Sequence, residues 1–538
     1  MKTSFSFGSA LAFRYLCNIM DETSYSGKRI ARNSLMLYLR MFVTMVIAFY
    51  TSRELLRVLG VEDYGTYNVV GSFVAVFSLF NSGVTLAIQR FLNYEIGTRN
   101  SERLQRVFST SFNILFGISL LIVLLGESAG WWFVTTQLNI PAGREEVALW
   151  VYQLTLLIFL INIVGSPFQA AIIAHEHFKA YAMLGMFEEL CKLSAVFLLM
   201  VIPFDKLILY MLLLTGVAVI TRGAYMLYCR KRFAECRYRF CFDRGLMREM
   251  FSFSAWNIFG SCAYIAKVQG VNIIINIFYG VTVNAAQGIA NQVNQAVTAF
   301  ITSFTTAVNP QIIKLYAQKD YGHLFPLVFK GSRIAGFLVL LFVVPIVCET
   351  QGILDVWLYK VEIPRYTVVF TQLILINALI DSFSQSLITL INAVGRIARY
   401  QMVVGGILIL NLPFTLLALW LGAPPYAAMI VGCGLSVAGL IARITIISRQ
   451  IDFPWREYLI KVLLRAGIVI ACVGATIAAY KMVVPHYRFD FLVNIAVCLL
   501  VTATCIYAIG LDATERHTLR EKITTWIKKP KSHDKNRR

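Results

Sequence analysis

The sequence has few charged residues for its length, and acidic residues are the scarcest of them. Of 538 residues, 29 are Asp or Glu and 49 are Lys or Arg, so charged residues make up 14% of the chain. Soluble domains carry about 25% charged residues. Because 58% of the residues are hydrophobic, the composition excludes a soluble globular enzyme and indicates a surface that faces lipid.

Motifs of known catalytic and metal centres are also missing. The chain contains no P-loop and no HExxH sequence, and the run His175-Glu176-His177 has the wrong spacing for a helical zinc pair. The eleven cysteines lie mostly in apolar runs and form no CxxC pair. We therefore expect no metal and no cofactor, and we interpret residues 175–177 as polar loop residues near lipid headgroups.

What the sequence has instead is a series of apolar runs. A helix needs about 20 apolar residues to cross the hydrocarbon core of a bilayer. We predict about fourteen such helices, joined by short connections, in an all-α polytopic membrane protein. They cover residues 33–56, 64–89, 107–127, 147–172, 180–202, 206–229, 251–278, 283–309, 327–348, 366–394, 400–421, 425–447, 462–484 and 489–510.

Basic residues are concentrated in alternate connections between these runs. With both termini placed in the cytoplasm, the inner segments hold 37 Lys and Arg residues, the outer segments hold 8, and 4 lie inside spans, which together account for all 49. Because cytoplasmic loops of membrane proteins are enriched in Lys and Arg, this bias predicts the orientation. The net charge of +20 therefore reflects topology and not a nucleic-acid partner.

The chain repeats itself with a period of about 220 residues. The pair Gly60-Val61 matches Gly280-Val281, and Asn162 aligns with Asp381. Six helices per repeat predict two lobes related by a pseudo-two-fold axis along the membrane normal. The expected organisation is a cytoplasmic leader (1–27), an N-lobe (28–230), a cytoplasmic linker (231–250), a C-lobe (251–450), two further helices (451–510) and a basic cytoplasmic tail (511–538).

Ionisable residues inside predicted spans are the strongest functional signal. A charge at the centre of a membrane helix costs about 2.5–3.5 kcal/mol, so such residues usually face a cavity or a partner. Arg40 and Lys267 lie in the first helix of each lobe without an acid three or four residues away, and Asp381 lies in the middle of 366–394. Two cations lining a cavity between the lobes would suit an anionic substrate. The alternative is an ion pair between one of them and Asp381.

Two further charges have simpler interpretations. Lys192 is placed to pair with Glu188 on its own helix, four residues away. Arg222 lies near the inner end of 206–229, from where its side chain can extend to the membrane surface.

Polar side chains follow one face of the predicted helix 283–309. Steps of three and four residues place them on a single stripe. Amides facing lipid would lack hydrogen-bond partners, so the stripe either lines water or holds helices together. We predict that it lines the substrate cavity, together with Asn257 and Tyr264 on 251–278. The stripe consists of Asn284, Gln287, Asn291, Asn294, Thr298, Thr302 and Thr305.

Two segments carry a family resemblance. They are SLMLYLRMFVTMVIAFYTSRELLRVLGVEDYGTYNVVGSF at 34–73, with an L-G-x-x-x-Y-G-x-Y turn from Leu59 to Tyr67, and VNAAQGIANQVNQAVTAFITSFTTAVNPQIIKLYAQ at 283–318. In these the chain resembles the multidrug/oligosaccharidyl-lipid/polysaccharide (MOP) exporter superfamily, and within it the bacterial polysaccharide flippases. Two six-helix lobes with two extra helices also fit this family.

The resemblance implies a flippase of the bacterial inner membrane. Its substrate would be a polyprenyl-diphosphate-linked oligosaccharide used in surface polysaccharide assembly, with the polymerase or glycosyltransferases of that pathway as partners. Arg40 and Lys267 would contact the diphosphate, as implied by their positions in the first helix of each lobe. The driving force is left open by the sequence: either Asp381 titrates and couples transport to an ion, or the membrane potential acts on the cavity charges.

Three rivals follow from the same sequence. A cation-coupled multidrug antiporter of the same fold would need acidic cavity residues, and Asp381 is one. A polytopic glycosyltransferase or polymerase would use Glu62-Asp63 in the first outer loop as an acidic motif, although the outer loops are short. A scaffold that transports nothing would not need the polar stripe.

Overall fold

The computed structural model describes residues 26–75, 77–136, 143–239, 241, 243–357, 363–483, 490–513 and 515–516, and these contain helices and connections but no strand. Nine of the described helices are long and apolar enough to cross a membrane, or ten if one bent pair counts as a single span. The prediction of an all-α polytopic membrane protein is confirmed. The number of fourteen spans stays a prediction, and residues 1–25 and 517–538 lie outside the described residues.

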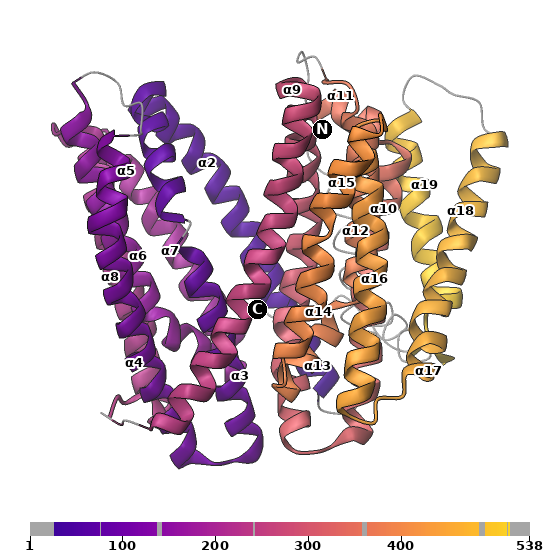
Figure 1. The fold of residues 1–538 in the computed structure, drawn as a ribbon, viewed down its shortest axis with the longest axis horizontal. Coiled ribbons are helices and arrows are strands. Elements are labelled where there is room, and N and C mark those ends of the chain that lie inside the picture. Colours follow the sequence, from indigo (N-terminus) through magenta and orange to yellow (C-terminus); the bar gives the residue numbers. More distant parts are fainter. Residues whose placement is uncertain are drawn as a thin grey trace, which may run out of the picture.

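The first half of the chain forms one helix bundle, seen on the left of Figure 1, which we call the N-bundle. Its helices share an apolar core that includes Val107, Phe108, Tyr152 and Phe168. The elements are α2 (Ser26–Ala75), α3 (Ser78–Thr98), α4 (Ser101–Leu125), the π-helix η1 (Gly126–Gly130), α5 (Trp131–Thr136), α6 (Glu145–Ala174), α7 (Phe178–Leu198), α8 (Lys206–Arg232) and the 3-10 helix η2 (Ala234–Cys236).

The second half forms the C-bundle, with two further helices on its outer side (Figure 1). These last helices pack against α10. The elements are α9 (Arg244–Ala317), α10 (Tyr321–Cys348), α11 (Thr350–Trp357), α12 (Thr367–Ser382), α13 (Gln385–Val394), α14 (Ala398–Ile409), α15 (Asn411–Trp420), α16 (Ala427–Gln450), α17 (Trp455–Tyr458), the π-helix η3 (Leu459–Leu464), α18 (Arg465–Val483), α19 (Asp490–Cys505) and the π-helix η4 (Ile506–Gly510).

Helix α9 contains a reversal of the chain, although its backbone is helical throughout. Phe253 stacks edge-on against Phe91 of α3, with ring centroids 6.0 Å apart. A Cβ on Gly97, only six residues along α3, would lie 2.9 Å from the carbonyl oxygen of Lys314. In a straight helix, residues 253 and 314 would be about 90 Å apart. Helix α9 must therefore fold back into two antiparallel limbs, as predicted for 251–278 and 283–309.

Helix α2 reverses in the same way. Arg40 lies on Tyr181 and Tyr50 lies near Phe197, so the first limb runs parallel to α7. Beyond the turn, Asp63 binds Arg144 just before α6, and Phe77 lies beside Phe159 within α6. A connection of only three residues, 175–177, joins α6 to α7 and makes them antiparallel. The two limbs of α2 therefore run in opposite directions.

Helix starts follow the positions of capping side chains. Asp243 accepts a hydrogen bond from the Leu246 N–H at 3.0 Å, and Asp320 accepts one from the His323 N–H at 3.2 Å. Asp and Asn are favoured at this position because they satisfy free N–H groups of the first turn. Two helices are thus longer than their predicted spans: α9 begins within the predicted linker 231–250, and α10 begins before residue 327.

The predicted span 366–394 is broken in two. Helices α12 and α13 meet at Phe383 and Ser384 with a bend of 41°. The carbonyl oxygen of Phe383 accepts a hydrogen bond from the Tyr458 hydroxyl at 2.7 Å, which satisfies it outside the helix. The break places Asp381 and Ser384 at the junction of two half-helices.

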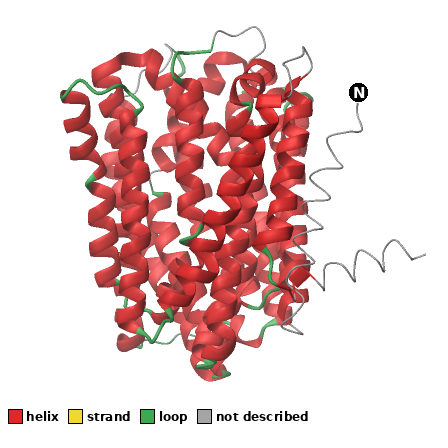
Figure 2. Cartoon of the chain, turned by 90° about the vertical axis from the view of Figure 1, so that its right-hand side faces the viewer, coloured by secondary structure: helices red, strands yellow, loops and turns green. Residues whose placement is uncertain are grey.

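All connections predicted to be cytoplasmic lie at one end of the molecule, which we call the basic end. It carries the α3–α4, α6–α7, α8–α9, α9–α10, α13–α14 and α16–α17 connections and is at the bottom of Figure 1. Figure 2 shows the helices running between this end and the opposite one. Of the described C-terminal segment, Glu515 is buried and binds Arg333 at 2.7 Å, so the predicted tail 511–538 begins as packed structure.

The two bundles are held together at the basic end. Glu176 of the α6–α7 connection forms a buried ion pair with Lys314 of α9 at 2.6 Å and accepts a hydrogen bond from Gln311 at 2.6 Å. Arg90 of α3 donates to the carbonyl oxygen of Asn392 at 2.7 Å. Toward the opposite end the ribbons of the bundles diverge in Figure 1.

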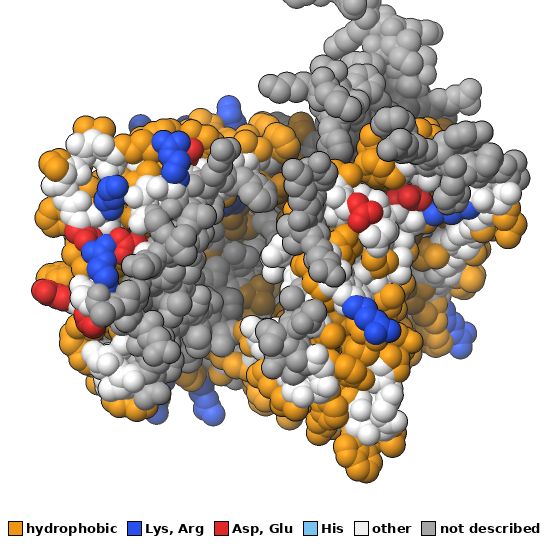
Figure 3. Space-filling model, turned by 90° about the horizontal axis from the view of Figure 1, so that it is seen from above, with side chains coloured by type: hydrophobic (Ala, Val, Ile, Leu, Met, Phe, Trp, Pro, Cys, Tyr) orange, Lys and Arg blue, Asp and Glu red, His pale blue; other side chains and the backbone are white. Residues whose placement is uncertain are grey.

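The opposite end carries a separate charge cluster within the N-bundle. Arg144 binds Asp63 at 2.9 Å and also binds Asp205, which joins the turn of α2 to the starts of α6 and α8. Burial raises the pKa of Asp205, but hydrogen bonds from the Ile208 N–H and Arg144 outweigh it and lower this pKa overall. Figure 3 looks onto this end, where the visible rim is mostly hydrophobic.

The turn between α13 and α14 depends on a glycine. Gly395 has a φ of +84°, and a Cβ there would overlap the Arg90 guanidinium. Gly422 has the same φ but open space around it. A left-handed alanine costs about 1–2 kcal/mol in either place. We expect Gly395→Ala to lower Tm clearly more than Gly422→Ala, measured on purified protein in detergent, because only Gly395→Ala also displaces Arg90. Equal losses would show that the Arg90 contact is unimportant.

Candidate substrate cavity

A polar cavity of about 810 Å³ lies inside the C-bundle. It is lined by both limbs of α9 and by α12, α13, α14, α15 and α16. Three charged residues contribute: Lys267 and Arg443, each with 8% of its surface exposed, and Asp381 at the α12–α13 break. Two cations and one acid give the cavity a net positive charge.

The charged groups of the cavity are only partly satisfied. Lys267 donates a long hydrogen bond of 3.5 Å to Ser436, and Arg443 donates one of 3.2 Å to Ser384, while the Arg443 Nε has no partner. Asp381 does not approach either cation within ion-pair distance among the described residues. The alternative interpretation of Lys267 as an ion-pair partner of Asp381 is therefore not realised, and an anion could bind both cations.

The polar stripe on the second limb of α9 lines this cavity. Its threonine hydroxyls bond back to their own helix, as in Thr298 to the Asn294 carbonyl oxygen at 2.9 Å. The amide oxygens of Gln287 and Asn294 are buried without a partner. Because an unsatisfied buried acceptor costs about 1–3 kcal/mol, these amides are suited to a ligand or water that donates hydrogen bonds. The stripe residues in the lining are Gln287, Asn291, Asn294, Thr298, Thr302 and Thr305, while the side chain of Asn284 lies outside those described.

Other helices add to the open hydrogen-bonding capacity. The amide oxygens of Asn377 in α12 and Asn411 in α15 are also buried, unpaired and in the cavity lining. Hydroxyl-rich molecules such as sugars supply many donors of the kind that these oxygens accept.

Asn257 and Tyr264 lie on the path toward the basic end. Both line a neighbouring cavity of about 670 Å³, and Tyr264 lines the main cavity as well. Asn257 is buried and accepts a hydrogen bond of 3.3 Å from Gln401 of α14. This contact bridges the first limb of α9 and α14 between the basic end and the main cavity.

Arg40 does not join this cavity in the structure. It lies in the N-bundle, with its guanidinium 4.1 Å from the centre of the Tyr181 ring. A Cβ on Gly185 would come within 2.9 Å of the Arg40 Cζ, so a glycine at this position makes room for the arginine. In this conformation Arg40 is not among the residues that line the cavity of Lys267, and the prediction that both cations contact one substrate stays a prediction.

The other charges of the N-bundle form a cluster. Arg222 donates to Asn162 at 2.7 Å and lies 3.6 Å from Glu188, so the interpretation that Arg222 extends to the membrane surface was wrong. Gly165 leaves the space that the Arg222 stem occupies. Lys192 does pair on its own helix, with Glu188 at 3.1 Å and Glu189 at 2.9 Å.

Arg443 was missed as a site residue because it lies at the inner end of the predicted helix 425–447, where it was taken as one of the basic residues on the cytoplasmic side. A signal for it existed in the repeat, since Arg222 and Arg443 are 221 residues apart (443 − 222 = 221). Arg222 packs on Gly165 and binds Asn162. At offsets of 219, Ser384 and Asp381 occupy the matching positions; Ser384 accepts a hydrogen bond from Arg443, and Asp381 has no ion-pair partner among the residues that the structure describes.

Two solved structures of transporters share this fold. An outward-facing multidrug resistance MATE family transporter of the MOP superfamily is 12% identical, covers 81% of this chain and 98% of its own, and gives a TM-score of 0.69. A MOP superfamily transporter from Pyrococcus furiosus, described as having a binding pocket of reverse polarity, is also 12% identical. It covers 79% of this chain and 96% of its own, with a TM-score of 0.67. The protein thus has the fold of MATE transporters.

Sequence similarity identifies the family. Residues 30–316, which are 287 of the 538, match the family described as polysaccharide biosynthesis protein. The chain belongs to this family, which confirms the resemblance to polysaccharide exporters seen in its sequence, and its fold is shared with the MOP superfamily transporters named above. No curated protein shows a significant sequence match to the chain.

Proposed function

We propose that the protein is a flippase that moves a polyprenyl-diphosphate-linked oligosaccharide across the bacterial inner membrane. The observation that carries this proposal is the C-bundle cavity, where buried Lys267 and Arg443 lie among unpaired amide oxygens. A lipid diphosphate carries about two negative charges, which buried cations can hold in place of water. The amide oxygens of the lining would accept hydrogen bonds from sugar hydroxyls.

Transport would proceed by alternating access of the two bundles. The contacts at the basic end close one side, and the bundles diverge toward the other. With the basic end in the cytoplasm, as the Lys and Arg bias predicts, this conformation faces outward. Both termini are then cytoplasmic. The polymerase or glycosyltransferases of the same pathway are the proposed partners.

A cation-coupled multidrug antiporter is the second candidate, and the unpaired Asp381 favours it. Asp381 lines the same cavity as Lys267 and Arg443, so the net charge there is positive and unfavourable for a cationic drug. We assign Asp381 to coupling, as a group that gains or loses a proton during the cycle. A glycosyltransferase is less favoured, because Asp63 of its supposed acidic motif is engaged by Arg144.

The proposed function is tested by export in a bacterial strain that lacks its own exporter of this class. Surface polysaccharide is measured by immunoblot and by labelling of intact cells, with the abundance of the protein checked in the same membranes. Restoration of surface polysaccharide is expected. If instead the cells gain drug efflux and no polysaccharide, the antiporter is the correct function.

The ion pair at the basic end offers a test of alternating access. Glu176→Gln removes the charge that pairs with Lys314, and loss of one partner of a buried ion pair costs about 3–5 kcal/mol. We expect the variant to shift toward the state that is open at the basic end. Val201 and Leu421 are exposed just after the ends of α7 and α15, on the side of the molecule away from the basic end. Spin labels at these two positions should then show a shorter distance between the bundles by double electron–electron resonance.

The matched control is Glu127→Gln, an exposed carboxylate that accepts a hydrogen bond from Gln153 within the N-bundle. It should leave the distance distribution between the labels unchanged. The same distribution in Glu176→Gln as in the unmodified sequence would show that the ion pair does not hold the bundles closed.

A further inference from the structure

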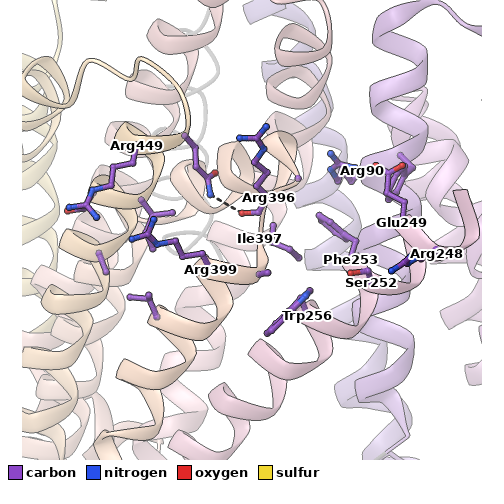
Figure 4. A pocket seen from close by; sticks show the side chains of 18 of the residues that line it. Arg90, Arg248, Glu249, Ser252, Phe253, Trp256, Arg396, Ile397, Arg399 and Arg449 are labelled. Carbon is purple, nitrogen blue, oxygen red and sulfur yellow. Dashed lines mark hydrogen bonds between the residues drawn. The ribbon is translucent and has the colours of Figure 1, made fainter. Parts of the chain in front are cut away.

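A second large cavity, of about 930 Å³, opens at the basic end of the C-bundle. It lies between the end of α3, the start of α9, the start of α14 and the end of α16, and Figure 4 shows it from close by. Its charge is one-sided, since the lining has a single acid, Glu249. Five arginines line it: Arg90, Arg248, Arg396, Arg399 and Arg449.

One of the five arginines has a structural task. Arg90 donates to the carbonyl oxygens of Asn392 and Ala393 at 2.7 and 3.4 Å, and its guanidinium lies 5.0 Å from the centre of the Phe253 ring. These contacts hold the end of α13, after which Gly395 turns the chain. The position of Arg396 and Arg399 at the cavity is thus set by buried structure.

The other four arginines are exposed to solvent at the mouth of the cavity. The guanidinium groups of Arg248, Arg396, Arg399 and Arg449 make no hydrogen bond or ion pair with any residue in the described ranges. Glu249, the acid of the lining, lies 4.0 Å from Arg103 outside the cavity. Like charges gathered in one cavity repel each other, and a bound anion would relieve that repulsion.

The depth and the walls of the cavity indicate where such an anion would come from. Helix α16 has 24 residues and is about 36 Å long, whereas the hydrocarbon core is about 30 Å thick. Arg449 in its last turn therefore lies at the level of the lipid headgroups. Trp256, Val403 and Ile446 add an apolar wall to the same cavity. An anion joined to a hydrocarbon chain fits both features.

We propose that this cavity binds the phosphate or diphosphate headgroup of a membrane lipid in the leaflet at the basic end. Guanidinium groups bind phosphate oxygens bidentately, and basic pockets between membrane helices on the cytoplasmic side bind anionic headgroups. The apolar wall would hold the first part of the lipid chain. Binding of a lipid headgroup in this cavity does not depend on which glycan is exported, so it can be tested by a binding measurement without any glycan.

The test measures binding to the full-length K267M/R443M variant, which lacks the two cations of the C-bundle cavity, in an uncharged detergent, so that the probes report on the basic-end cavity. Three probes are compared: farnesyl diphosphate, inorganic pyrophosphate and phosphatidylglycerol. The variant R396Q/R399Q/R449Q removes three positive charges from the cavity. The control R230Q/K231Q/R232Q removes three from the exposed end of α8, also at the basic end. We expect the Kd for farnesyl diphosphate to rise about tenfold or more in the cavity variant and to stay within about twofold in the control.

A further variant and two competing ligands distinguish a diphosphate lipid from a phospholipid and from free pyrophosphate. R396K/R399K/R449K keeps the charge but loses bidentate geometry, so its Kd should fall between the other two. Farnesyl diphosphate should bind at least about tenfold more tightly than pyrophosphate, because only it reaches the apolar wall. Displacement by phosphatidylglycerol would mark the site as one for phospholipids, and no displacement as one for diphosphate lipids.

Three results would overturn the proposal. An unchanged Kd in the cavity variant would show that the arginines bind no phosphate. An equal loss in the α8 control would mean general attraction to a basic surface. Equal affinity for pyrophosphate and farnesyl diphosphate would remove the lipid from the proposal.

Discussion

Replacing Lys267 and Arg443 together by methionine is expected to reduce polysaccharide export to below about a tenth of the unmodified level. Both cations are buried in the C-bundle cavity, and their partners are single hydroxyls at 3.5 and 3.2 Å. Methionine keeps much of the volume and removes the charge that would hold a diphosphate. The measurement is surface polysaccharide in the strain lacking its exporter, normalised to protein abundance.

The control for this experiment removes two exposed cations at the basic end, by Lys179→Met and Arg230→Met. This control variant should export surface polysaccharide at the unmodified level. Arg443→Lys alone should reduce export less than Arg443→Met, because lysine keeps the positive charge. It should still reduce export, because lysine lacks the paired N–H donors of the guanidinium. Full export by K267M/R443M at normal abundance would exclude this cavity as the diphosphate site.

A disulfide across the basic end is expected to stop transport completely and reversibly. A Cβ on Gly97 of α3 would lie 2.8 Å from the Cβ of Ala317 of α9. A disulfide needs about 3.5–4.5 Å between these atoms, so G97C/A317C should form one after a shift of about 1 Å. The bond would join the N-bundle to the C-bundle and prevent the basic end from opening.

Translocation of lipid-linked oligosaccharide is measured in inverted membrane vesicles, treated first with copper phenanthroline and then with a reductant. The single variants G97C and A317C control for the native cysteines, of which the sequence has eleven. Activity should vanish on oxidation of the double variant only and return on reduction. Transport through the cross-linked protein would contradict alternating access between these bundles.

Much of the cavity could be predicted from residue spacing, and the reason is periodicity. Asn291, Asn294 and Thr298 recur every three or four residues, which puts them on one helix face whatever surrounds it. That face does line a cavity. The repeat likewise predicted a chain reversal near the matched pairs Gly60-Val61 and Gly280-Val281, and both α2 and α9 do reverse between the predicted spans on either side.

The partners of single charges could not be predicted in the same way. Arg40 and Lys267 have equivalent places in the order of helices, yet Arg40 stacks on Tyr181 and Lys267 faces the C-bundle cavity. Arg222 was expected at the membrane surface, but Gly165 on another helix makes room for it inside. The environment of a charge depends on side chains about 60 residues or more away, which no local pattern contains.

The sequence by itself determined that the protein is embedded in lipid and that its elements are helices, and it predicts the orientation. These follow from hydropathy, helical periodicity and the distribution of Lys and Arg, which are sums over many residues and tolerate errors at any one of them. Only the tertiary structure decided that Arg443 and Lys267 share a cavity with Asp381, that Arg40 is not in its lining, and that five arginines meet at the basic end. Such groupings depend on how helices pack, where one glycine or one broken helix changes which side chains meet.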